Sequence, residues 1–339
     1  MMQPSFFNYA QAIYNKRYDA EEIAYHTWYN GTKMLGMFQV FCQETLHRAG
    51  VTPEEIDESL LFSYRRFCLE EKGNSLVTVN RKLAPICQVL KVAQAEGLYS
   101  PLSAESLKSA FCQRTPCRYG PEASRFQKEG GEAVRYLSDA QLKSLVSYYN
   151  SLKDSYVRDS LDLFFFSFHA CGLRVSDIVT LEWSHILLDH CRLRKVMVKS
   201  KKRLEIPLSE AAIQILRRWK ERQPEGRFVF GLLPDDMNLE ADAEMARAID
   251  NVNRTVGRRL NAVGRHLGLP FPLGMHVARH TFAVKALNSA RVDVHLISHL
   301  LGHSSVLVTE KVYAKLLLPT LSKELSEKLS FMEFGLEKC

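Results

Sequence analysis

The sequence reads His276-Val277-Ala278-Arg279-His280 near its C-terminal end, then Leu301-Gly302-His303, then Tyr313. A single arginine far upstream, Arg174, ends the tetrapeptide Cys-Gly-Leu-Arg. Together these motifs supply two guanidiniums, several imidazoles and one phenol. Guanidiniums donate paired hydrogen bonds to phosphate oxygens. The set therefore suits attack on a phosphodiester by a tyrosine hydroxyl, a reaction that needs no metal and no cofactor.

Length and composition place few limits on this interpretation. A chain of 339 residues is long enough for two domains, each with its own core. Its hydrophobic content of 46% and charged content of 24% are ordinary for a soluble globular protein. The sequence shows neither an apolar run of the roughly 20 residues that span a bilayer nor a secretory signal. The eight cysteines are scattered and form no Cys-x-x-Cys pair, so we expect reduced thiols in a cytoplasmic protein.

The net charge of +7 comes mostly from residues after position 135. The densest basic run has no acidic residue within it: Arg192, Arg194, Lys195, Lys199, Lys201, Lys202 and Arg203. A run of this kind suits a polyphosphate partner. On charge alone, a solvated hairpin tip is an equally good interpretation.

Helical periodicity dominates the first 115 residues. Apolar spacing predicts one helix within 20–49, and Thr52 followed by Pro53 predicts the start of a second. A third is expected over 75–96 with a kink or break at Pro85, and a fourth from Pro101. Such helices make a compact bundle.

Residues 116–134 hold a cluster of Pro and Gly and are expected to form a linker. A helix is then expected to start at Ser138, and Ser176-Asp177 to cap another. Residues 192–208 alternate as a β-hairpin through Val196, Val198, Leu204 and Ile206, with a basic tip. The remaining helices are expected at 138–153, 155–171, 209–222, 241–267, 276–289, 293–301, 305–317 and 319–333. The predicted fold is mainly α with a small β element.

Taken singly, each motif has an ordinary explanation. Arg174 alone would be a surface arginine, and Tyr313 a half-buried helix aromatic. The motif at 276–280 lacks the glutamate of a zinc-protease helix. Histidines also recur every four residues at His295, His299 and His303, but no cysteine or carboxylate completes a metal site there. We therefore expect no metal, and the joint order of the motifs is far more specific than any one of them.

That joint order resembles the tyrosine recombinase (phage integrase) family. The motifs that carry the resemblance are Gly-Leu-Arg-Val-Ser-Asp at 172–177, Val-Lys-Ser-Lys-Lys at 198–202 followed by Ile-Pro-Leu at 206–208, His-Val-Ala-Arg-His-Thr-Phe-Ala at 276–283, Leu-Leu-Gly-His-Ser-Ser at 300–305, and Thr-Glu-Lys-Val-Tyr at 309–313. The resemblance implies a SAM-like core-binding domain at 1–115, a linker at 116–134 and a catalytic domain at 135–318, which clamp DNA between them. It also implies that the tail 319–339 docks on a neighbouring protomer, although packing on its own domain is an alternative.

The resemblance also implies a role for each site residue. Arg174, Arg279 and His303 would bind the phosphate oxygens, and Tyr313 would attack the phosphorus. His276 would act as general base or proton relay, because a free phenol has a pKa of about 10. Lys199, favoured over Lys201 and Lys202 by its register with Ile-Pro-Leu, would protonate the 5′-oxygen.

Three further positions complete the expected site. Asp177 would orient a histidine or arginine from behind. Lys201, Lys202 and Arg203 would contact DNA. The product would be a 3′-phosphotyrosine that stores the bond energy, so rejoining would need neither ATP nor metal.

We therefore expect a site-specific DNA recombinase that acts through a Holliday junction, with a dimer on each double-stranded DNA site and a tetramer in the synapse. Integration, excision and inversion stay open, as do accessory DNA-bending proteins and association with the nucleoid. Two alternatives use the same fold: a type IB topoisomerase-like activity, and a catalytically silent DNA-binding protein. A metal-dependent nuclease would need a carboxylate cluster, for which the spaced acids of 235–250 are the only candidate.

Overall fold

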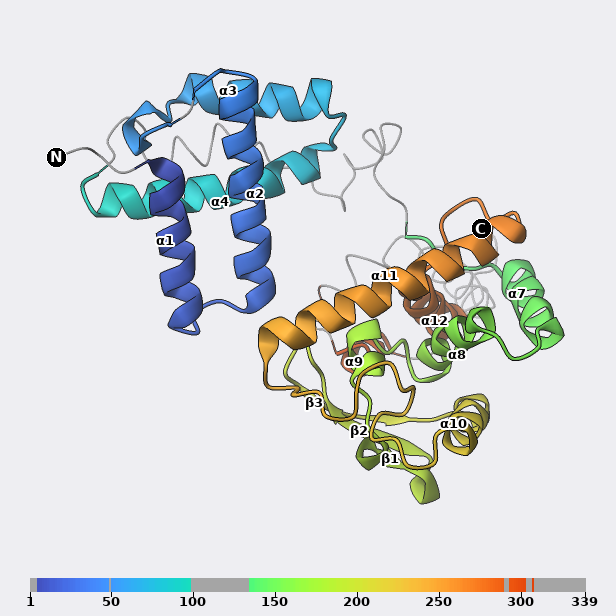
Figure 1. Cartoon of the computed structure of the whole chain (residues 1–339). Helices are drawn as coiled ribbons and strands as arrows, with labels where there is room; N and C mark the ends of the chain where they lie inside the picture. The colour runs from blue at the N-terminus through green and yellow to red at the C-terminus, as the bar shows by residue number, and fades with distance from the viewer. Residues whose placement is uncertain (1–4, 49, 99–133, 290–292, 303–306, 308–339) are drawn as a thin grey trace, which may run out of the picture. The chain divides into compact units, whose positions relative to one another are not determined.

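The computed structural model describes residues 5–48, 50–98, 134–289, 293–302 and 307 (Figure 1). The chain divides into two compact units, Met1–Glu129 and Gly130–Cys339. Most of the expected linker, the whole tail, and the helices expected from Pro101 and at 305–317 lie outside the described residues.

The first unit is a helical bundle. Its elements are α1 (Phe6–Asp19), α2 (Tyr25–Glu44), a 3₁₀ turn (Pro53–Glu55), α3 (Glu58–Arg66), a π-helical turn (Phe67–Glu71) and α4 (Leu76–Ala95). Phe6, Phe38 and Tyr64 are fully buried at its centre, with ring centroids of Phe38 and Tyr64 4.9 Å apart. The sequence reading missed α1, although Phe6, Phe7, Ala10 and Tyr14 repeat at helical spacing and are all buried.

Two expectations about this unit were wrong in detail. Thr52 caps only the short 3₁₀ turn, whose Glu55 side chain accepts from the Thr52 N–H at 2.7 Å. The helix proper starts later, where the Asp57 carboxylate accepts from the Leu60 N–H at 2.7 Å. Of the kink or break expected at Pro85, the break is wrong, because α4 continues through this residue, which is buried in the core, whereas the kink stays a prediction. Packing of the apolar face thus outweighs the lost backbone hydrogen bond.

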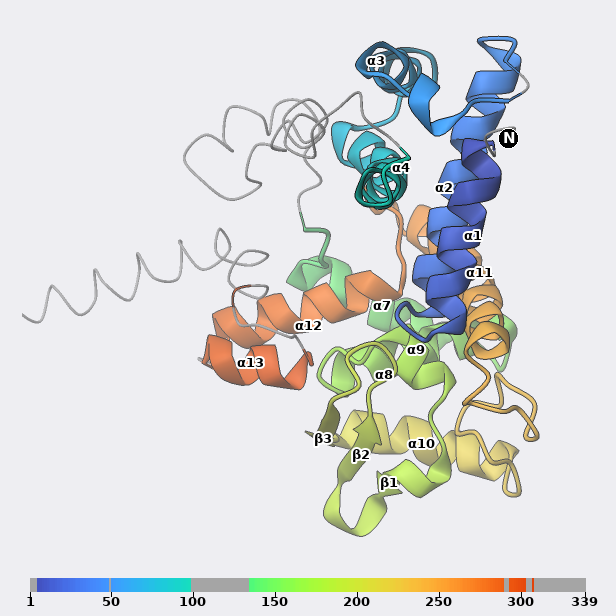
Figure 2. The ribbon, with the colours of Figure 1, turned by 90° about the vertical axis from the view of Figure 1, so that its left-hand side faces the viewer.

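The second unit is built around a buried helix. Its elements are α7 (Asp139–Ser151), α8 (Tyr156–His169), α9 (Val175–Val179), a 3₁₀ turn (Trp183–His185), β1 (Ile186–Leu187), a 3₁₀ turn (Leu188–His190), β2 (Arg192–Val196), β3 (Arg203–Pro207), α10 (Glu210–Arg222), α11 (Asp242–His266), α12 (Met275–Ser289) and α13 (Val294–Leu300). Eight consecutive residues of α8, Ser160 to Ser167, are buried, and the helix contacts α10, α11 and α12 (Figures 1 and 2). α7 begins at Ser138 with a capping box to Gln141, as predicted.

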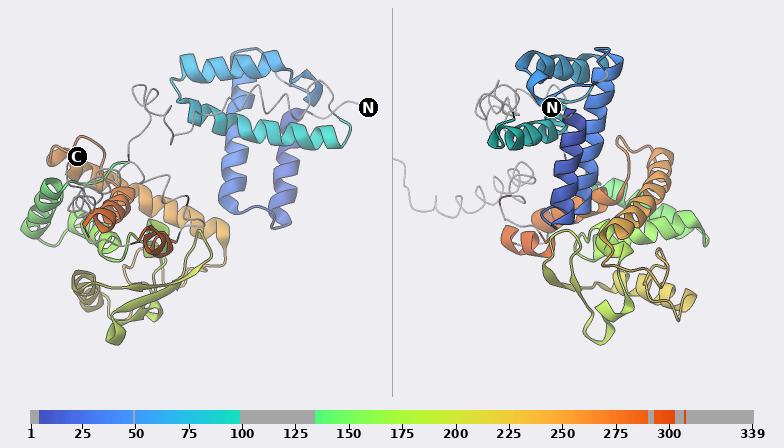
Figure 3. Two further views of the ribbon diagram at one scale, coloured as in Figure 1. Left: turned by 180° about the vertical axis from the view of Figure 1, so that it is seen from behind. Right: turned by 60° about the vertical axis from the view of Figure 1, so that its left-hand side comes forward.

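A three-stranded antiparallel sheet, ordered β1-β2-β3, lies beside these helices. Seen from behind, α12 and α13 lie above its strands, and α13 contacts β3 (Figure 3). The predicted hairpin is present, but the alternation along β2 was assigned to the wrong face. Leu193 and Lys195 point inward opposite Ile206 and Leu204, whereas Val196 is 54% exposed. Side chains alternate between the two faces of a strand, so an error of one residue exchanges the buried and exposed sets. The apolar pattern of β2 alone did not decide between the two assignments.

Three further findings concern the chain as described. No helix in these residues is both long and apolar enough to cross a membrane. Within the same residues, no group of three or more His, Cys, Asp or Glu side chains is placed to hold a metal ion. Five cysteines carry no disulfide: Cys42, Cys68, Cys87, Cys171 and Cys191.

Candidate active site

The turn between α8 and α9 places Arg174. Gly172 there has a positive φ of 73°, and an added Cβ would lie 3.0 Å from Leu301 Cδ2 and 3.2 Å from Arg279 Cγ. Only glycine fits both the backbone and the space. Arg174 follows as the N-cap residue of α9, half-buried, and its Nη2 donates to the Gly302 carbonyl at 3.5 Å.

Arg279 lies in the second turn of α12 and is only 8% exposed. Its Nη1 donates to the Gly172 carbonyl and its Nη2 to the Leu301 carbonyl, each at 2.7 Å. These bonds fix the guanidinium plane to two backbone segments from different parts of the chain. Arg174 and Arg279 are thus brought together at the α8–α9 turn and the end of α13.

His276 lies one helical turn before Arg279, and its side chain is exposed. Desolvation by the surrounding protein lowers the pKa of His276, and the positive charges of Arg279, Lys199 and Arg174 lower it further. These charges show that four of the predicted site residues share one electrostatic neighbourhood.

His280 lies beside His276 on α12, with ring centroids 6.4 Å apart. Burial, followed by the charges of His276 and Arg279, lowers the pKa of His280 to about 4. His280 is therefore a neutral imidazole at neutral pH. The sequence motif contains this residue, but spacing alone gave it no role.

The β2–β3 turn brings Lys199 to this neighbourhood. Lys199 is exposed on the turn, and its neighbour Ser200 lies close to Gly302, where an added Cβ would meet Ser200 Oγ at 3.6 Å and Arg174 Nη1 at 3.5 Å. Lys201, with a φ of 54°, completes the turn. Lys201, Lys202 and Arg203 are all exposed, as a DNA-contacting set requires.

The sequence predicted that Asp177 helps to cap α9, and this was wrong. The carboxylate is fully buried, and its Oδ1 accepts from the Val198 N–H at 2.7 Å. Burial raises the pKa of Asp177, while that hydrogen bond and the charges of Arg174, Lys195 and Arg279 oppose the rise. The carboxylate therefore fastens the hairpin turn to α9, because Val198 immediately precedes Lys199.

The basic run of the hairpin is less uniform than its sequence. Arg192 and Arg194 both pair across the sheet with Glu205, at 2.5 and 2.9 Å. Lys195 is 5% exposed, and its Nζ donates to the Thr180 carbonyl at 2.7 Å. The interpretation of these three as part of a free cationic tip was wrong, because Glu205 on the neighbouring strand pairs with both arginines and Lys195 is buried.

A second basic surface, on α11, escaped the sequence analysis. Arginines recur at one face of this helix, spaced by seven, four and seven residues, and all are exposed: Arg247, Arg254, Arg258 and Arg265. We call this the α11 arginine face. Arg258 and Arg265 have no acidic partner among the residues that the structure describes. The helical spacing of the arginines was the available signal.

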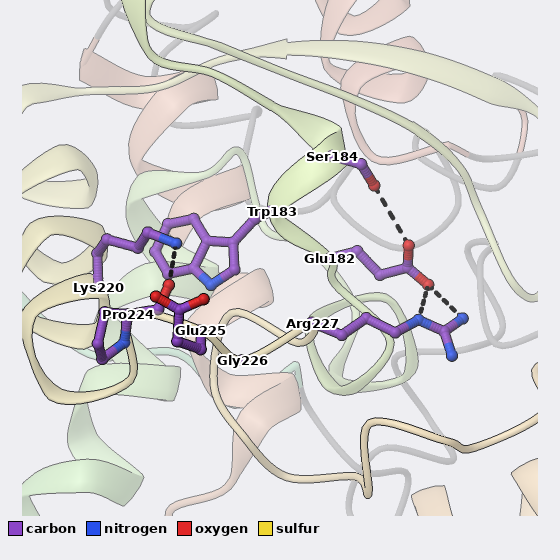
Figure 4. Close-up of a pocket in the computed structure, with 8 residues that line it drawn as sticks. All are labelled: Glu182, Trp183, Ser184, Lys220, Pro224, Glu225, Gly226 and Arg227. Carbon is purple, nitrogen blue, oxygen red and sulfur yellow. Dashed lines mark hydrogen bonds and ion pairs between the residues drawn. The ribbon is translucent and has the colours of Figure 1, made fainter.

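One hollow of about 370 Å³ lies elsewhere in the second unit and contains none of the predicted site residues (Figure 4). Its charges are largely satisfied internally. Arg227 donates to Glu182 through Nε at 3.0 Å and Nη2 at 2.7 Å, and Lys220 Nζ lies 4.9 Å from the Trp183 ring centroid. We assign no chemistry to this hollow. His303 and Tyr313 lie outside the described residues.

Comparison with known proteins identifies the family. The model of the phage integrase family matches residues 135–318, more than half of the chain, and that of the phage integrase SAM-like domain matches residues 5–104. The tyrosine recombinase XerC of Chlorobaculum parvum is 30% identical over 276 residues, 77% of this chain and 75% of that protein. The tyrosine recombinase XerD of Pseudomonas putida is 32% identical over 142 residues, but the match covers 42% of this chain and only 45% of that protein, less than half of its length.

Solved structures share the fold. A Tn1549 transposon integrase in complex with transposon right end DNA aligns with a TM-score of 0.67 at 15% identity, covering 96% of this chain and 100% of that one. A lambda integrase tetramer bound to a Holliday junction aligns with a TM-score of 0.59 at 16% identity, covering 87% and 76%. The family matches agree with the two-unit helical fold. The chain therefore belongs to the phage integrase family, the family of the site-specific tyrosine recombinases.

Proposed function

We propose that this protein cuts and rejoins double-stranded DNA at specific sites through a covalent 3′-phosphotyrosine formed by Tyr313. One observation carries the proposal. Arg174 at the start of α9, Lys199 in the β2–β3 turn, and His276 and Arg279 on α12 meet in one electrostatic neighbourhood.

The two arginines bind the scissile phosphate. Negative charge grows on the non-bridging oxygens as the nucleophile attacks, and charge-assisted hydrogen bonds are strongest there. Backbone carbonyls at Gly172 and Leu301 hold the Arg279 guanidinium in a fixed plane before DNA arrives. Such preorganisation avoids a reorganisation cost during the reaction. His303 joins this set by the resemblance of its motif.

His276 serves as general base or proton relay for Tyr313. Its lowered pKa keeps the imidazole neutral and able to accept a proton at neutral pH. As the Tyr313 Oη–P bond forms, the P–O5′ bond breaks and its electron pair goes to O5′. Lys199 donates the proton that the leaving O5′ takes up. Rejoining is the reverse sequence, so the bond energy is kept and no ATP is used.

Two surfaces would hold the DNA outside the reacting phosphate. One is the exposed hairpin tip, Lys201, Lys202 and Arg203, and the other is the α11 arginine face. Exposed arginines and lysines bind the phosphate backbone through charge. With a core-binding domain at 1–115, a linker at 116–134 and a catalytic domain at 135–318, the two domains would clamp the duplex.

The lambda integrase tetramer on a Holliday junction supports assembly of this chain as a dimer on each site and a tetramer in the synapse. In that assembly the tail 319–339 would dock on a neighbouring protomer. Accessory DNA-bending proteins and a location on the nucleoid belong to the same proposal.

A covalent-adduct assay tests the proposal. Purified protein is incubated with chelator, without ATP, and with nicked duplexes from the flanks of its own gene. We expect an SDS-resistant, protease-sensitive adduct from the wild type and none from Tyr313→Phe. Adduct in both proteins would place the nucleophile elsewhere, and DNA binding without adduct in either would favour a silent DNA-binding protein. Relaxation of supercoiled DNA without exchange between two sites would favour the topoisomerase-like alternative.

A further inference from the structure

Lys195 is a buried lysine to which the proposed mechanism gives no role. Only 5% of its surface is exposed, and its Nζ donates to the Thr180 carbonyl at 2.7 Å. Burying an ammonium group is costly unless the group is paired and hydrogen-bonded. A lysine in this position on β2 therefore needs a structural or functional reason.

The partner carbonyl ends the helix that Arg174 begins. Arg174 is the N-cap residue of α9 and Thr180 is its C-cap residue, with only five residues between them. A cation at the C-terminal end of a helix stabilises its last carbonyl groups. Because α9 is only about 7 to 8 Å long, the bond to Thr180 places β2 at a set position relative to Arg174 at the other end of the helix.

A second hydrogen bond also joins the hairpin to α9, and here too the hairpin supplies the donor. Asp177 on α9 is fully buried and accepts from the N–H of the half-buried Val198 at 2.7 Å. One bond thus runs from β2 to α9 and the other from the turn to α9. Lys199 directly follows Val198, so the two bonds together set where the turn presents Lys199.

The charges in this region favour the same arrangement. Asp177 is a fully buried acid whose charged neighbours are Arg174, Lys195 and Arg279. The ammonium of Lys195 helps to keep this carboxylate ionised, and the ionised form is the stronger acceptor for the Val198 N–H. Lys195 therefore supports the second bond as well as making the first.

We propose that Lys195 is a positioning residue for DNA cleavage, which ties β2 to the end of α9 and so holds Lys199 in place relative to Arg174. This inference rests on the proposed function, in which Lys199 protonates the leaving 5′-oxygen. Without Lys195 the turn would still carry Lys199, but the ammonium would reach the leaving oxygen in a smaller fraction of the bound complexes.

A change of leaving group separates this role from a general loss of structure. The substrates are nicked duplexes carrying either the normal O5′ or a sulfur atom at the bridging 5′ position of the scissile phosphate. A 5′-thiolate is a far weaker base than an alkoxide and leaves without a proton. The rate of covalent-adduct formation is measured in single turnover for Lys195→Met, which keeps the length of the side chain but removes its charge and donors.

We expect Lys195→Met to cleave the oxygen substrate about 10- to 100-fold more slowly than the wild type, part of the roughly 10²- to 10⁴-fold that a general acid contributes. On the sulfur substrate we expect a rate within about threefold of the wild type. Lys199→Ala should show the same pattern more strongly, and Arg279→Ala should be slow on both substrates. Lys195→Arg, which keeps a cation and donors, should fall between Lys195→Met and the wild type on the oxygen substrate.

Lys220→Met is the matched control, because Lys220 also donates to a backbone carbonyl, that of Pro224 at 2.6 Å, but lies away from the site. It should behave as the wild type on both substrates. Thermal denaturation checks that each variant is folded. If Lys195→Met does not fold, the two substrates are compared with Lys195→Arg instead.

Equal slowing of the Lys195 variants on both substrates, or no slowing on either, would overturn the proposal. If the sulfur substrate fails to restore Lys199→Ala, the role of Lys199 is wrong and this proposal falls with it. Absence of adduct from the wild type on both substrates would instead refute the proposed function itself.

Discussion

Replacing Gly172 by alanine should damage both stability and cleavage, because this glycine touches the side chain of Arg279. Alanine at a φ of 73° costs about 1–2 kcal/mol in backbone strain. Its Cβ would also lie 3.0 Å from Leu301 and 3.2 Å from both Arg279 and Phe282. Overpacking of this kind costs about 1–3 kcal/mol, so the free energy of unfolding should fall by about 2–5 kcal/mol in total.

The chain offers a matched control at the end of α11. Gly268 has a φ of 66°, and an added Cβ there meets nothing within 4 Å. Gly268→Ala should therefore lose only the strain of about 1–2 kcal/mol. Urea denaturation of both variants isolates the crowding at Gly172 as the difference between them.

Cleavage should separate the two variants more sharply than stability does. The carbonyl of Gly172 accepts a hydrogen bond from Arg279, so a shift of this turn moves the guanidinium that binds the phosphate. Removing one donor of this kind costs about 10²- to 10³-fold in rate, and displacing it should cost about tenfold or more. Single-turnover adduct formation should be slowed in Gly172→Ala and unchanged in Gly268→Ala. Equal stability losses with equal cleavage rates would refute the reasoning.

Three other predictions concern buried polar groups. Burial and cationic neighbours lower the pKa of His280 to about 4, so between pH 6.5 and 4 the unfolded chain binds a proton that the folded chain does not. The free energy of unfolding should therefore fall by up to about 3 kcal/mol from pH 6.5 to 4. In denaturation curves measured across this range, His280→Gln should reduce the dependence of the free energy of unfolding on pH. Asp177→Asn keeps an acceptor for the Val198 N–H and Asp177→Ala does not, so the alanine variant should cleave about tenfold more slowly than the asparagine variant, and equal rates would show that this hydrogen bond is unimportant. Asp162 is fully buried and accepts a hydrogen bond from Trp219 Nε1 at 2.9 Å. Asp162→Ala should lower the free energy of unfolding by about 3–5 kcal/mol, measured by urea denaturation. A loss below about 1 kcal/mol would show that this buried hydrogen bond contributes little to stability.

Local patterns predicted the elements that depend on neighbouring residues. The helix start at Ser138 followed from a residue type that caps helices, and the basic hairpin followed from two short strands around a lysine-rich turn. These signals act within a few residues, where backbone geometry is set by caps, turns and apolar spacing. The break considered at Pro85 does not occur, because burial against the bundle core outweighs the local effect of a proline.

The sequence by itself determined which chemical groups this protein brings to its site and in which order they occur, and its motifs were enough to indicate the family. Only the tertiary structure decided how those groups are held. Hydrogen bonds join Arg279 to Gly172 across 107 residues and Arg174 to Gly302 across 128. Lys195 belongs to a basic run in the sequence but is buried in the fold, where it donates to the Thr180 carbonyl at the end of α9. Contacts over such separations depend on how whole elements pack, and a periodic pattern along one segment carries no information about its distant partner. The roles of Asp177 and Lys195 therefore became visible only when the strand and the short helix were placed against each other.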